Sequence, residues 1–139
     1  MRKTIMIGSV ECNFKTSAAL PRMYRLKFQR DLFNDLNSID RQIKAQEKKK
    51  EEMRQIALDK GIPFDESEYE STLPVNTLTT FENIAFLMHK HGDPTQPTEI
   101  DEWLDQFETF DIYNVFPEIL GMWNDENKQF STPKKENEE

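Results

Sequence analysis

The stretch from Thr79 to Trp123 repeats one pattern three times, with apolar side chains spaced as on one face of an α-helix. The apolar positions of the three patterns are Phe81, Ile84, Ala85 and Met88; then Ile100, Trp103, Leu104 and Phe107; then Ile112, Val115, Phe116, Ile119, Leu120 and Trp123. Three successive amphipathic helices must bury these faces against one another or against the rest of the chain. The sequence therefore predicts a helical core built from its last third.

The first residues have the character of a β-hairpin. Residues 4–14 flank the pair Gly8-Ser9, which suits a tight two-residue turn. In the register that this turn imposes, Ile5 faces Cys12 and the apolar side chains share one side of the hairpin. An isolated hairpin is only marginally stable in water, so we expect this face to lie on the helices.

The middle of the chain is polar and strongly helix-forming. We predict one helix from the cap at Thr16-Ser17 to about Asn37, and a break with a new cap at residues 38–40. An exposed, charged helix would then span residues 40–60, and an acidic loop residues 62–78. These segments connect the hairpin to the predicted core.

Together these patterns predict a mainly α fold, a small helical domain of about five helices with an N-terminal β-hairpin packed on it. Residues 1–124 would form this single domain. Residues 125–139 are almost entirely polar, and we expect them to form a disordered tail.

Possible helix caps mark where the late helices begin. Thr79 with Glu82, and Thr98 with Asp101, have the spacing of a capping box. Asp111 is placed to cap the last helix.

Charge is distributed unevenly along the chain, whose net charge is −8. Residues 1–60 carry 14 Lys/Arg against 8 Asp/Glu, a net of +6, whereas residues 61–124 carry 13 acids and one base, a net of −12. This asymmetry favours either internal docking of the two parts or head-to-tail contact between copies.

Nucleic acid is an unfavourable partner for so acidic a chain, and no apolar run could span a membrane. With one cysteine and no complete signal peptide, we expect a cytosolic protein.

The sequence offers no convincing catalytic, metal or cofactor site. His89 and His91 are the only histidines, and two residues apart on a helix they point about 200° from each other. We expect them to have capping or surface roles near a helix C-terminus. No glycine-rich phosphate loop or nucleophile–base motif is present. We therefore expect a binding protein and not an enzyme, with no cofactor.

The helix predicted to end at about Asn37 has apolar side chains on more of its faces than a small core should need. We hypothesise that part of this helix and its flanking arginines contact another polypeptide; the alternative is that its apolar residues belong to the core. The candidate partner-binding residues are Arg22, Tyr24, Arg25, Leu26, Phe28, Arg30 and Phe33.

Several short segments occur in the order in which they are found in one known family. They are residues 14–25 (FKTSAALPRMYR) with Phe28, Arg30 and Asp31; residues 81–85 (FENIA); residues 102–107 (EWLDQF); residues 111–113 (DIY); residues 117–120 (PEIL); and Trp123. Through them the chain resembles tail assembly chaperones of long-tailed phages and prophages of Gram-positive bacteria. The resemblance covers roughly residues 5–36 and 79–123.

The resemblance implies a small helical protein that works in the host bacterial cytoplasm during phage tail morphogenesis. Such chaperones bind and solubilise the tape-measure protein, a very long coiled-coil-like chain, and help to recruit major tail (tube) subunits. They are absent from the mature virion.

A different class of function also fits the acidic stretch, a regulatory protein that mimics nucleic acid to bind a repressor or nuclease. A third hypothesis is a small metal-dependent enzyme that uses His89 and Asp93.

Overall fold

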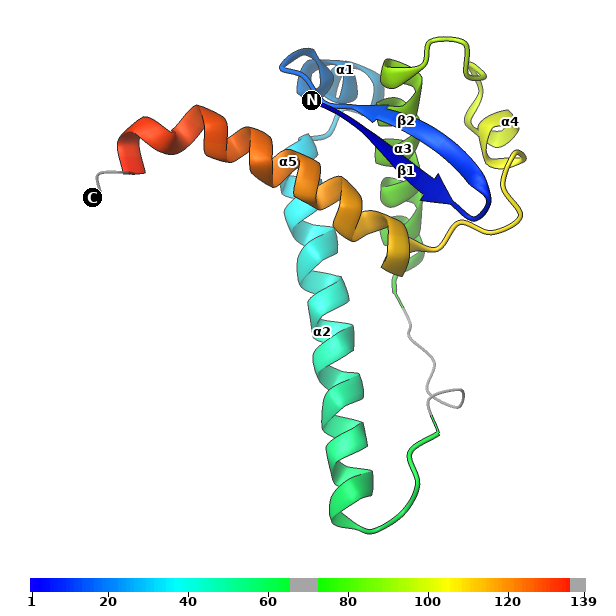
Figure 1. Ribbon diagram of the computed structural model, residues 1–139, viewed down its shortest axis with the longest axis vertical. Helices are drawn as coiled ribbons and strands as arrows, with labels where there is room; N and C mark the ends of the chain where they lie inside the picture. Colours follow the sequence, from blue (N-terminus) through cyan, green and yellow to red (C-terminus); the bar gives the residue numbers. More distant parts are fainter. Residues whose placement is uncertain (66–72, 136–139) are drawn as a thin grey trace.

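A computed structural model describes residues 1–65 and 73–135, with side chains described up to residue 124. Figure 1 shows a small helical body from which the ends of the second and the last helix extend in different directions. The elements in chain order are β1 (Arg2–Ile7), β2 (Val10–Lys15), α1 (Ala19–Phe28), α2 (Leu32–Asp59), α3 (Val75–Gly92), α4 (Ile100–Leu104) and α5 (Ile112–Lys135). The predicted fold class is confirmed: the described part of the chain is mainly helical, and its N-terminal hairpin packs against the helices.

The hairpin has the predicted register. Ile5 pairs with Cys12 across two antiparallel strands, and Gly8 takes a left-handed conformation in the turn, with φ 62°. The face with Ile5, Cys12 and Phe14 is buried, and it lies on α3 and on the first part of α5 (Figure 1). Burial of one face fixes the register, because a slip of one residue would turn every apolar side chain outward.

Helix α3 is the centre of the core, since it contacts β2, α1, α2, α4 and α5. Its buried apolar residues are Phe81, Ile84, Ala85, Phe86, Leu87 and Met88. Around it pack the buried Trp103 of α4 and the buried face of α5, with Val115, Phe116 and Ile119. The predicted core of late helices is present, and β1, β2, α1 and the first part of α2 also contribute buried side chains to it.

The predicted break at residues 38–40 is wrong, because these residues lie inside α2. The break is at Gln29–Asp31, where Gln29 is left-handed and the Asp31 side chain accepts from the Asn34 N–H at 2.9 Å. The reason is an apolar stripe that continues without interruption. Its buried members, at alternating spacings of four and three residues, are Leu32, Leu36, Ile39 and Ile43. The predicted charged helix 40–60 is thus the continuation of a helix that starts in the core.

Two of the predicted helix starts are also wrong. Helix α3 begins at Val75, directly after Pro74, so residues 75–78 of the predicted acidic loop are helical. The Thr79 hydroxyl donates to the Val75 carbonyl one turn earlier, at 3.2 Å, instead of capping the helix. Helix α4 has Glu99 as its N-cap with no side-chain bond, so Thr98 does not cap it. Residues 66–72 of the predicted loop lie outside the described residues.

The start of α5 agrees with the prediction, whereas its end differs. Asp111 accepts from the Tyr113 N–H at 2.9 Å, as expected of a cap. The α5 backbone continues to Lys135, beyond the residue 125 at which a disordered tail was predicted. A helix already nucleated by packing extends at little further cost. Residues 136–139 lie outside the described part of the chain.

The second half of α2 forms an arm that leaves the body. Ile43 is the last α2 residue in the core cluster, and the helix continues to Asp59. At 1.5 Å per residue this arm is about 24 Å long. Figure 1 shows it pointing away from the other helices. No helix among the described residues combines the length and apolar character that crossing a membrane requires.

Candidate partner-binding surfaces

The structure divides the predicted partner-binding residues between surface and core. Arg22, Arg25 and Leu26 are exposed on the outer side of α1, with 60% of Leu26 accessible. We call these three residues the α1 face. Tyr24 is 1% exposed, so it belongs to the core and not to a contact surface. This burial corrects the prediction that Tyr24 contacts a partner.

The remaining aromatic residues of the hypothesis are half-buried. Phe28 packs on the Tyr24 ring with centroids 5.1 Å apart. Phe33 meets the buried Trp123 edge-on, with centroids 5.5 Å apart. Both rings therefore stabilise the fold through aromatic contacts, whichever partner they also touch.

Arg30, the last residue of the hypothesis, belongs to a hydrogen-bonded hub that joins α1 to α2. It donates to both oxygens of Asp35 at 2.8 Å, and the Tyr24 hydroxyl donates to the same carboxylate at 2.6 Å. Burial opposes ionisation of Asp35, but the bonds from Arg30 and Tyr24 outweigh it and lower its pKa. Burial, together with the neighbouring carboxylate, raises the pKa of Tyr24. Asp35 is thus a buried anion with its partners in place.

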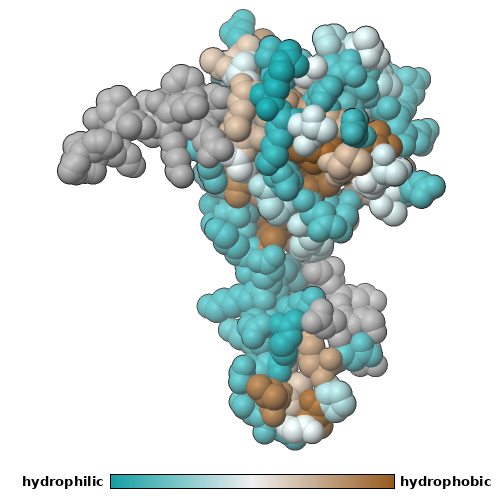
Figure 2. Space-filling model, in the orientation of Figure 1, coloured by the Kyte–Doolittle hydropathy of each residue, from teal (hydrophilic) through white to brown (hydrophobic). Residues whose placement is uncertain are grey.

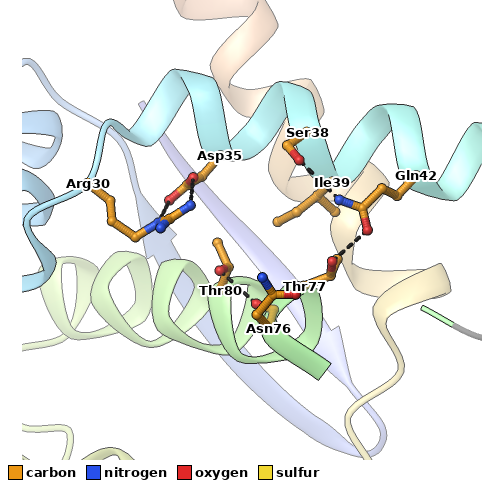
Figure 3. Close-up of a pocket in the computed structure, with 8 residues that line it drawn as sticks. All are labelled: Arg30, Asp35, Ser38, Ile39, Gln42, Asn76, Thr77 and Thr80. Carbon is orange, nitrogen blue, oxygen red and sulfur yellow. Dashed lines mark hydrogen bonds and ion pairs between the residues drawn. The ribbon is translucent and has the colours of Figure 1, made fainter. Parts of the chain in front are cut away.

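A small polar pocket lies between α2 and α3 (Figure 3). Arg30, Asp35, Ser38, Ile39, Gln42, Asn76, Thr77 and Thr80 line it. The Thr77 hydroxyl donates to Gln42 at 2.5 Å, and Gln42 donates to Ser38 at 3.0 Å. Its volume of about 40 Å³ is enough for a few water molecules and too small for an organic cofactor. The pocket is best understood as a polar junction between two helices.

The structure also brings together a serine and a histidine that are far apart in the sequence. Ser17 Oγ lies 2.9 Å from His91 Nε2, a pair that the sequence did not reveal. In a Ser-His-Asp triad, a neighbouring carboxylate stabilises the imidazolium that forms during nucleophilic catalysis. Here burial lowers the pKa of His91, and Lys15 and Arg2 lower it further. This environment disfavours the imidazolium, so the pair is better suited to joining the start of α1 to the end of α3.

His89 is a core residue, which corrects the predicted surface or capping role. It is 2% exposed, accepts a hydrogen bond from Trp103 Nε1 at 2.9 Å and stacks on Phe14. Burial lowers its pKa, although the charge of Asp93 partly opposes the shift. The missed signal was spacing, because His89 follows the buried Ala85 by four residues. Within residues 1–65 and 73–135, no cluster of His, Cys, Asp and Glu could hold a metal ion.

The end of the α2 arm carries a surface that the sequence did not reveal. Four apolar side chains are exposed there, which we call the apolar knob: Met53 (45%), Ile56 (53%), Leu58 (69%) and Ile62 (54%). Figure 2 shows brown, hydrophobic atoms gathered at this tip. The turn that follows the helix closes on itself, because the Ile62 N–H donates to the Ala57 carbonyl at 2.9 Å. The knob is therefore a folded surface and not a frayed helix end.

A second surface of different chemistry surrounds α4. Its exposed acids, which we call the acidic face, are Glu99, Asp101, Glu102, Asp105, Glu108 and Asp111. No Lys or Arg occurs in residues 99–111. Half-buried apolar side chains lie among these acids along the chain, namely Ile100, Leu104, Phe107 and Phe110. This surface thus combines strong negative charge with accessible apolar area.

Comparison with protein-family models, with curated proteins and with solved structures finds no match for this chain.

Proposed function

We propose that this protein binds and shields an apolar segment of another polypeptide, and that it is not an enzyme. The observation that carries the proposal is the apolar knob, which the arm holds away from the body. Its four apolar side chains are each exposed over about half of their surface. Met53 and Ile56 share one side of the helix, whereas Leu58 points to another side of the tip. Exposed apolar surface of this kind often marks an interaction site.

The arm suits this role because different parts of it keep the protein soluble and hold the knob in a fixed direction. Its charged middle favours solubility, while its packed base between Leu32 and Ile43 fixes its direction. An amphipathic partner helix could lie along such a surface with its apolar stripe covered. The α1 face offers a second, smaller contact that combines Leu26 with two arginines.

On the resemblance in sequence, we propose that the client is the tape-measure protein of a long-tailed phage. The chain would then act as a tail assembly chaperone in the host bacterial cytoplasm and leave before the virion matures. A coiled-coil-like client exposes long apolar stripes that aggregate unless they are covered. Recruitment of major tail subunits would be a further part of this role.

Co-expression with tape-measure fragments tests this proposal. We expect Ile56→Glu to weaken capture of the fragments at least tenfold and to lower their solubility, because it places a charge in the apolar knob. Val75→Glu is the matched control, since Val75 is 80% exposed and lies outside the knob. Both variants should keep the wild-type melting temperature. Equal capture by the two variants would contradict a role for the knob.

A second pair of variants tests the α1 face. Leu26→Ala should reduce capture without changing stability, because Leu26 is exposed. Phe33→Ala should instead lower the melting temperature, because it removes the contact with Trp123. If Leu26→Ala leaves capture unchanged, the α1 face is not part of the client site.

The acidic face favours the alternative proposal of nucleic-acid mimicry. A mimic of this kind would bind a basic repressor or nuclease through many charge pairs, so its affinity would fall steeply with salt. The affinity for a client that binds through the apolar knob would change much less with salt concentration. A salt titration of each interaction between 50 and 500 mM therefore discriminates between the two proposals.

A further inference from the structure

We propose that, without a client, the apolar knob of one copy docks on the acidic face of a second copy. The contact would join molecules head to tail. The occupant of the knob is thus another molecule of this chain, and the client would have to displace it. Only this last step, displacement, rests on the proposed function.

The two surfaces match in chemistry. Residues 48–60, the end of the α2 arm, carry five Lys/Arg and three Asp/Glu, whereas residues 99–111 carry six acids and no base. Each combines charge with accessible apolar side chains. Pairing two acidic faces would oppose twelve like charges, whereas the end of the α2 arm offers lysines that an acidic face can meet. Opposite charge therefore favours the mixed contact.

The fold keeps the two surfaces of one molecule apart. Figure 1 shows α4 beside the hairpin, near one end of the long axis, and the tip of the α2 arm at the other end. Helix α2 is continuous from Leu32 to Asp59, and Leu36, Ile39 and Ile43 anchor its base in the core, so the arm holds its tip away from the acidic face. The complementary surface must come from another molecule.

A contact between two different surfaces leaves one free surface on each partner. It generates rings or open chains instead of closing as a symmetric dimer. The knob offers only a few apolar side chains, so it contributes much less than the roughly 800 Å² that one partner supplies to a standard stable interface. Association should accordingly be weak, with a dissociation constant on the order of tens of micromolar, and a client could compete for the knob.

Sedimentation velocity of the full chain tests the proposal. From about 5 to 500 μM at 50 mM salt, the weight-average mass should rise beyond that of a dimer, and 500 mM salt should reverse the rise. Ile56→Glu disables the knob, with Met53→Glu, three residues earlier on the same side of the helix, as a second variant of this surface. Glu102→Lys combined with Asp105→Lys disables the acidic face. All these side chains are exposed, so circular dichroism melts should match the wild type.

Mixing the two kinds of variant gives the sharpest result. Each variant alone should be monomeric, with association at least tenfold weaker than that of the wild type. An equimolar mixture should form dimers and stop there, because only one intact knob and one intact acidic face can meet. A monomeric wild type, a monomeric mixture, or unimpaired association of the acidic-face variant would overturn the proposal.

Client capture separates this inference from the proposed function. The Glu102→Lys, Asp105→Lys variant should still bind tape-measure fragments, since its knob is intact. If no variant or wild type binds the fragments but the mixture still forms dimers, only the proposed function fails. If the fragments bind and the mixture stays monomeric, only the self-association fails.

Discussion

Replacing Gly92 with alanine should destabilise the fold, because strand β2 passes directly against this residue. An ideal Cβ at Gly92 would lie 2.2 Å from the Asn13 carbonyl oxygen and 3.2 Å from the Lys15 nitrogen. The obstructing atoms are backbone atoms, so the hairpin itself would have to move by about 1 Å. Overpacking of this kind typically costs about 1–3 kcal/mol. In a chain of this size the melting temperature should fall by about 3–10 °C.

Gly121→Ala is the matched control for this experiment. Gly121 lies within α5, and a Cβ there would meet nothing within 4 Å. Alanine should therefore gain helix propensity and stabilise the protein by up to about 1 kcal/mol. Calorimetry and urea denaturation at pH 7 would measure both changes. If Gly92→Ala is neutral or stabilising like Gly121→Ala, the hairpin does not lie on the end of α3 and the reasoning is refuted.

Two further predictions concern buried titratable groups. Asp35→Asn should lower the free energy of unfolding at pH 7 by about 1–3 kcal/mol, because two donors lose an ionised acceptor. Since the folded state lowers the pKa of Asp35, this stability is present above the unfolded value of 3.8 and is lost as pH falls through the folded pKa. Urea denaturation at pH 7 and pH 3 should show a smaller pH effect in the variant; an equal effect would contradict the hub. Burial lowers the pKa of His89, so its contribution is complete above pH 6.5 and is lost as pH falls through the folded pKa. His89→Gln should therefore reduce the loss of stability between pH 7 and pH 5. The pKa of His91 is also lowered, so His91→Gln measures how much of that loss comes from the second histidine.

The features that the sequence predicted correctly are those that repeat locally. The hairpin register follows from a period of two, and the buried faces of α3 and α5 follow from a period near 3.6. The Asp111 cap follows from chemistry within three residues. In each case burial or hydrogen bonding acts on neighbours in the chain, so the pattern contains the information.

The features that it missed depend on distant partners. Ser17 and His91 are 74 residues apart, and the bond from Trp103 to His89 joins two different helices. A buried polar side chain has no periodicity of its own; it is stable only where tertiary packing supplies a partner. The apolar knob was missed for a related reason, since exposure of Ile56 depends on what the fold leaves uncovered. The candidate site was thus less predictable than the fold.

The boundary between α1 and α2 shows why periodicity alone misplaced a helix end. Apolar side chains continue from Tyr24 through Phe28 to Leu32 at helical spacing, so the pattern favours one unbroken helix. The structure instead turns at Gln29, whose φ of 57° is left-handed, and restarts α2 at the Asp31 cap. The turn allows the Arg30 and Tyr24 side chains to reach Asp35. A non-periodic interaction therefore determines where the helix ends.

This geometry makes opposite predictions for two substitutions at Gln29. A left-handed conformation costs a non-glycine residue about 1–2 kcal/mol, so Gln29→Gly should stabilise the protein by up to about 1 kcal/mol. Part of the gain is lost with the side-chain bond from Gln29 to the Leu26 carbonyl, at 2.9 Å. Gln29→Val should destabilise by about 1 kcal/mol or more, because a β-branched residue tolerates positive φ poorly. In an unbroken helix glycine would be the more damaging substitution, so urea denaturation of the two variants distinguishes the two structures by the order of their stabilities.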